Sequence, residues 1–152
     1  MILYVEDILK EVNILNWYKG EAIKNGDADA VFIQTAKDEE DALRYYLRDA
    51  VTDILLFANA NRVTFTCERK DDMLRFVLTP LREGREHMLD IMKEAIRQYL
   101  VYEVRRLWMM NVRPDWADVS MRESLRENIR EAMNNVTAMG KKVRRRYSLM
   151  GI

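Results

Sequence analysis

The sequence shows no catalytic pattern among the side chains that could carry out acid–base or nucleophilic chemistry. The single histidine, His87, would need a carboxylate or a nucleophile within hydrogen-bond reach to act as a general base, and no sequence feature places one there. The single cysteine, Cys67, alternates with apolar residues, which is typical of a small packed side chain rather than of a nucleophile. We therefore expect no catalytic residue and a protein that is not an enzyme.

Patterns that bind metals or phosphates are also missing from the sequence. The acidic run Asp38–Asp41 offers oxygen ligands, but consecutive helical residues point in different directions, so we interpret the run as charge at a helix start. The five glycines form neither GxxxxGK nor GxGxxG, and no second cysteine accompanies Cys67 in a zinc pattern. We expect no metal and no cofactor.

Two features are better suited to binding a partner. Trp116 lies in a short loop after Pro114, where it either anchors a partner or folds back and closes the end of a helix bundle. The C-terminal segment 141–152, called the basic tail below, carries five positive charges and no acidic residue. Its candidate partner-binding residues are Lys141, Lys142, Arg144, Arg145, Arg146, Tyr147, Leu149 and Met150.

The basic tail can bind either the phosphates of a nucleic acid or the acidic face of another subunit. Its last residues are largely apolar. Phosphate contacts do not need an apolar end, whereas a peptide that docks on a protein does. The tail therefore favours a protein partner.

Apolar residues spaced three and four apart predict the helices that position these side chains. Four such stripes are present, at about 5–15, 39–58, 83–111 and 121–139. Gly20 is expected to end the first segment, and a Ser120–Glu123 capping box to begin the last. Ile91 and Met121 fall on these stripes and are expected in the core. The long third helix has a second, partly apolar face, which predicts a central position in the bundle.

Between the second and third helices the apolar spacing changes to every second residue. The alternation over 63–68 and again over 74–79 predicts a β-hairpin at about 62–79, with a four-residue loop at 69–72. An isolated hairpin is marginally stable in water, so its apolar face must pack on helices or on another subunit. Its outer edge also offers a route to assembly by strand addition.

These elements predict a mainly α fold, a bundle of about four helices with one inserted hairpin. We expect a single domain over 1–140, followed by the basic tail. No apolar run approaches the roughly 18–20 residues that cross a bilayer, and the N-terminus lacks the basic region of a signal peptide. We therefore expect a cytoplasmic protein without membrane contact.

The charges are balanced in total but divided along the chain. The 25 basic and 25 acidic residues give a formal net charge of zero, which argues against a protein that coats nucleic acid in bulk. Residues 1–61 contain six basic and twelve acidic residues, whereas 62–152 contain nineteen and thirteen. Either the two parts interleave within one molecule, or the basic part of one copy meets the acidic part of another, head to tail.

The order of the expected elements resembles that of the head–tail connector and neck proteins of tailed bacteriophages. The shared features are a short first helix, an acidic-capped helix, an inserted hairpin, a long helix and a C-terminal extension. The resemblance lies in architecture and assigns no residue roles. It implies a non-enzymatic virion protein that forms a ring and contacts copies of itself and portal or tail components. The alternative is a small nucleic-acid-binding regulator that uses the basic tail, with Arg105 and Arg106.

Overall fold

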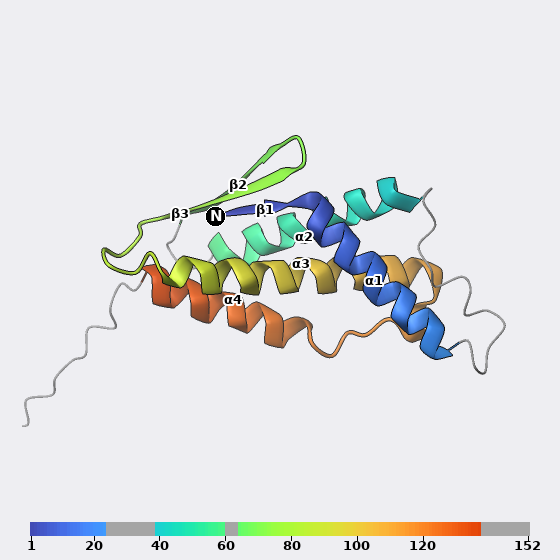
Figure 1. Ribbon diagram of the computed structural model, residues 1–152. Helices are drawn as coiled ribbons and strands as arrows, with labels where there is room; N and C mark the ends of the chain where they lie inside the picture. Colours follow the sequence, from blue (N-terminus) through green and yellow to red (C-terminus); the bar gives the residue numbers. More distant parts are fainter. Residues whose placement is uncertain (24–38, 60–63, 138–152) are drawn as a thin grey trace, which may run out of the picture.

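The computed structural model describes residues 1–23, 39–59 and 64–137, and shows a mainly α fold with a small sheet (Figure 1). Its elements in chain order are β1 (Ile2–Tyr4), α1 (Val5–Ile23), α2 (Glu40–Ala58), β2 (Thr64–Lys70), β3 (Met73–Thr79), α3 (Met88–Val112), the 3-10 helix η4 (Pro114–Trp116) and α4 (Arg122–Thr137). The expected fold class is confirmed. The basic tail lies outside the described residues, as does Gly140.

Helix α3 is the centre of the molecule. It packs against α1, α2 and α4, and buries side chains on more than one of its faces. Figure 1 shows the sheet on one side of the helices and α4 along the other side of α3. The second apolar face of this helix predicted a central position in the bundle, and α3 has that position.

The sheet contains three antiparallel strands in the order β1-β3-β2. The hairpin of β2 and β3 was expected, but the strand β1 was not: its backbone pairs with β3, with Leu3 opposite Leu74. The expected four-residue loop is wrong, because the ladder extends to Lys70 opposite Met73 and leaves a two-residue turn. Leu3 and Leu74 are both buried, so β1 adds apolar contact as well as backbone hydrogen bonds.

Several predicted boundaries are also corrected. Helix α1 continues through Gly20, because a glycine inside a helix costs only about 1 kcal/mol relative to alanine. Helix α3 begins at Met88 rather than near residue 83, after turns in which Gly84 has a φ of +75°. The expected capping box does not form: the Ser120 hydroxyl donates to the Asp118 carboxylate instead, at 2.7 Å.

Two residues expected in the core are exposed. Ile91 on α3 and Met121 before α4 keep 56% and 51% of their surface accessible. Both lie on apolar stripes, but no described element covers them. Each lines a different hollow of the surface.

Candidate partner-binding site

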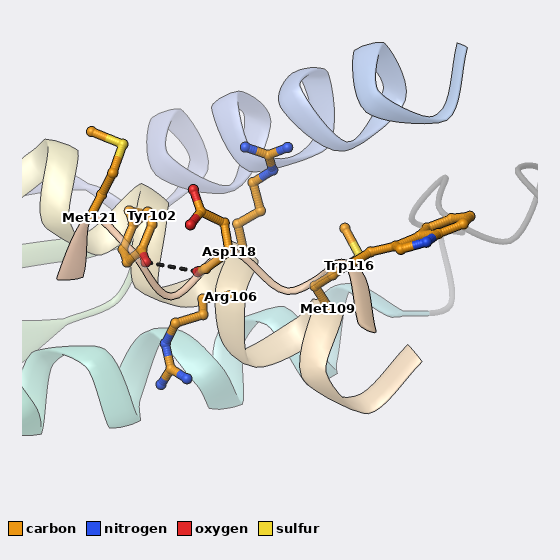
Figure 2. Close-up of a pocket in the computed structure, with 7 residues that line it drawn as sticks. Tyr102, Arg106, Met109, Trp116, Asp118 and Met121 are labelled. Atoms are coloured by element: carbon orange, nitrogen blue, oxygen red, sulfur yellow. Dashed lines mark hydrogen bonds between the residues drawn. The ribbon is translucent and has the colours of Figure 1, made fainter. Parts of the chain in front are cut away.

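A pocket of about 270 Å³ lies where the C-terminal half of α3 meets η4 and the loop before α4 (Figure 2). We call it the Trp116 pocket. Its lining combines aromatic, apolar and charged side chains, from Tyr102, Arg105, Arg106, Met109, Trp116, Asp118 and Met121.

Pro114 determines how the chain turns at this place. A proline lacks the N–H that would continue the helix, so α3 ends at Val112 and η4 begins at Pro114. The Arg113 guanidinium then lies 4.0 Å from the centre of the Trp116 ring, a cation–π contact. Tyr102 fixes the next part of the loop, because its hydroxyl donates to the Asp118 carbonyl at 2.7 Å (Figure 2).

Trp116 is half-buried and packs against the core while it also lines the pocket. Both interpretations of this residue therefore have a structural counterpart, because the side chain packs against the core and also lines the pocket. Its role as an anchor for a partner stays a prediction.

Exposed apolar side chains occur among the lining residues and directly next to them in the sequence, and we call them the apolar rim. Met110, Val119 and Met121 are 45%, 62% and 51% exposed. The Met110 sulfur accepts a contact from the Arg106 guanidinium at 2.8 Å, which joins that side chain to the pocket wall. Exposed apolar residues that gather beside a pocket are typical of a protein interaction surface rather than of a free surface.

A group of paired charges behind the pocket holds α2, α3 and α4 in place. Glu103 is almost fully buried and accepts hydrogen bonds from Arg106 at 2.7 and 2.8 Å. Arg122 lies 3.0 Å from the same carboxylate and 3.3 Å from Asp53 on α2. Arg126 donates to both oxygens of Asp53, at 2.6 and 2.7 Å. We call this set the charge network.

The electrostatics of the charge network indicate a structural role. Burial by itself would raise the pKa of Asp53, but hydrogen bonds from Arg126 and Tyr99, with the charges of Arg126 and Arg122, outweigh it and lower that pKa. The hydrogen bond to Glu103 raises the pKa of Arg106. A carboxylate that is held ionised by arginines cannot serve as a proton donor near neutral pH.

The two arginines considered for nucleic-acid binding are engaged inside the protein. Arg106 is paired with Glu103, and the Nε of Arg105 donates to the Asn16 side chain at 3.1 Å. Burial lowers the pKa of Arg105.

A second hollow, called the acidic groove below, lies between the N-terminal half of α3 and α4 and has a volume of about 650 Å³. Its lining is acidic, polar and apolar, from Met88, Asp90, Ile91, Glu94, Ala95, Gln98, Asn128, Glu131, Ala132 and Asn135. The apolar pattern of the sequence did not predict this groove. A signal was present in Asp90 and Glu94, which flank the apolar Ile91 on one helix, but Glu131 joins them only through the packing of α4 on α3.

The other described residues considered for chemistry line neither hollow. His87 is exposed just before α3. Cys67 is half-buried in β2, and burial raises the pKa of its thiol to about 11. In the acidic run, Glu39 accepts a hydrogen bond from the Trp108 indole at 3.2 Å and Glu40 pairs with Arg44. Within the described ranges, no group of three or more histidine, cysteine, aspartate or glutamate side chains could hold a metal ion.

Comparison with protein-family models, curated proteins and solved structures found no match for the chain. None of the helices in the described part of the chain is both long enough and apolar enough to cross a membrane. The candidate partner-binding residues of the basic tail lie outside the described residues.

Proposed function

We propose that this protein is a non-enzymatic structural adaptor that assembles head to tail into an oligomer, as a head–tail connector or neck component of a phage or prophage. The observation that carries the proposal is the Trp116 pocket with its exposed apolar rim. Such a surface suits contact with another protein, because its arginines are paired and its hydroxyl and carboxylate groups hold the loop.

The two ends of α3 present different surfaces, which suits head-to-tail association. On α3, residues 102–109 contribute to the Trp116 pocket and residues 88–98 to the acidic groove. The midpoints of these two helix segments are about 19 Å apart at 1.5 Å per residue. Contacts between unlike surfaces of identical copies generate a ring when the rotation between copies closes. The head–tail connector proteins that this chain resembles in architecture form rings.

A nucleic-acid-binding regulator is the second candidate, and the five positive charges of the basic tail favour it. Its binding to duplex DNA would weaken steeply with salt, with a slope of about −0.9 for each phosphate contacted. Arg105 and Arg106 are paired within the protein, so in this alternative the basic tail would supply most of the phosphate contacts.

Sedimentation velocity and native mass spectrometry over a wide concentration range test the proposal. For the wild type, we expect the fraction of oligomer to increase with protein concentration. Replacing two exposed rim residues, Val119→Glu with Met121→Glu, should weaken association about tenfold or more, because carboxylates would be buried in the contact. Leu56→Glu controls for a carboxylate added to the surface, since Leu56 is 72% exposed on α2 and lines neither hollow. A wild type that stays monomeric at every concentration would contradict the proposal.

A further inference from the structure

We propose that the acidic groove receives the basic tail of a neighbouring copy. This inference rests on the proposed function, because it names a second contact between neighbouring subunits. It assigns a binding role to a groove in the described part of the chain and gives the tail a specific acceptor.

Two carboxylates in the groove are not paired with any described residue. Asp90 and Glu131 line it from opposite helices, and within residues 1–23, 39–59 and 64–137 neither forms a hydrogen bond or an ion pair. Glu94 differs from them, since Arg97 and Gln98 donate to its carboxylate. No lysine or arginine lines the groove. A cationic segment would thus find two carboxylates without a competing partner.

The lining of the groove is also partly apolar. Ile91 is 56% exposed there, and Met88, Ala95 and Ala132 lie beside it. Polar amides of Gln98, Asn128 and Asn135 complete the lining and can bond to the backbone of an extended peptide.

The basic tail combines the same two properties with opposite charge. It has five basic residues at 141–146 and four apolar residues among the last six positions. A peptide that docks in a groove commonly gains affinity from apolar contacts and selectivity from charge. The basic tail and the acidic groove are therefore complementary both in charge and in apolar contacts.

The direction of α4 favours a neighbour over the same molecule. α4 passes along the groove from Asn128 to Asn135 and ends at Thr137, just past the groove's end. A tail that occupied the groove of its own molecule would have to reverse direction after Thr137, whereas the groove of a neighbour requires no such reversal. The 15 residues after Thr137 can span up to roughly 50 Å when extended, against about 15 Å of α3 between Met88 and Gln98.

The test combines two variants that each lose one half of the contact. The groove variant carries Asp90→Lys and Glu131→Lys, and the tail variant ends at Gly140. Each should self-associate about tenfold more weakly than the wild type in sedimentation velocity at low salt. A mixture of the two should form a 1:1 complex, because one supplies the tail and the other supplies an intact groove. The control carries Asp41→Lys and Asp49→Lys on α2, which change the net charge equally on exposed residues outside the groove.

Zero-length carboxyl–amine cross-linking locates the contact. In a mixture of unlabelled and ¹⁵N-labelled wild type, links from Asp90 or Glu131 to Lys141 or Lys142 should join light and heavy chains. Links within single chains only would overturn the inference. Unchanged association in the groove variant would also overturn it while the proposed function stands. A wild type that stays monomeric would contradict both, and a tail that binds duplex DNA without any groove cross-link would assign it to nucleic acid.

Discussion

Replacing Asp53 by asparagine tests whether the charge network holds the helices together. Asp53 lies on α2 and receives two hydrogen bonds from Arg126 on α4 and one from the Tyr99 hydroxyl on α3. Arg122 lies 3.3 Å away on α4. Asp53→Asn keeps the size and one acceptor oxygen of the side chain but removes its charge, so the variant isolates the electrostatic part of these contacts.

The expected loss follows from the number and the burial of these contacts. Hydrogen bonds to charged groups contribute about 1.5–3 kcal/mol each. The Asp53 and Arg126 side chains are partly shielded from water, so the loss should remain below the roughly 3–5 kcal/mol of a fully buried broken pair. We expect a decrease of about 2–3 kcal/mol in the free energy of unfolding, or roughly 4–12 °C in Tm for a chain of this length.

Urea unfolding, monitored by circular dichroism between pH 3 and pH 7, provides the measurement. The pKa of Asp53 is lower in the folded state than the ordinary value of about 3.9 in the unfolded chain. The stabilisation is therefore complete above the unfolded value and is lost as the pH falls through the folded value. The difference between the wild type and Asp53→Asn should be largest at pH 7 and should shrink below about pH 4.

Asp49→Asn is the control for this prediction. Asp49 lies one turn earlier on α2, is exposed, and has no hydrogen bond or ion pair among the described residues. Its substitution should change stability by less than about 0.5 kcal/mol. An Asp53→Asn variant that loses no more than this control, or a loss of equal size at pH 3 and pH 7, would refute the electrostatic role of the network.

Two further predictions concern single sites. The Cys67 thiol, with a pKa of about 11 against an ordinary 9.0, should react with an alkylating reagent at pH 8 about a hundredfold more slowly in the folded protein than in urea; equal rates would contradict its burial. Gly84→Ala should lower the free energy of unfolding by about 1–2 kcal/mol, because Gly84 has a φ of +75° while a Cβ there meets nothing within 4 Å. Gly84→Asn should lose less, and an alanine variant as stable as the wild type would contradict the backbone explanation.

The helices were predictable because burial of one face repeats along the sequence. The stripes over 39–58 and 121–139 led to α2 and α4, since each has one apolar face. Strand β1 could not be found in this way. It has three residues, too few for an alternating pattern, and it exists because the free edge of β3 can pair with it. The helix end predicted at Gly20 was wrong for another reason. The free-energy cost of one glycine in a helix is small compared with the stabilisation from the contacts of the whole helix.

The candidate site was predictable only in part. Trp116 was found from its residue type and its place after Pro114, but the pocket requires Tyr102 and Asp118, which approach it from different segments. Ile91 was assigned to the core because its spacing matches the apolar stripe of α3. Periodicity identifies a face that is suited to burial, but it does not show whether another element of the same molecule covers that face.

The division of charge along the chain has a different meaning in the folded protein. Part of it is cancelled inside one molecule, since Asp53 from the acidic part meets Arg122 and Arg126 from the basic part. Asp90 and Glu131 are the groove carboxylates that form no hydrogen bond or ion pair with the described residues, and both belong to the basic part of the sequence. The basic part of the sequence therefore also carries an acidic surface, on α3 and α4, although the count by position places the excess of acidic residues in 1–61. A chain with no net charge can still carry a docking surface of one sign, because packing decides which charges are neutralised internally.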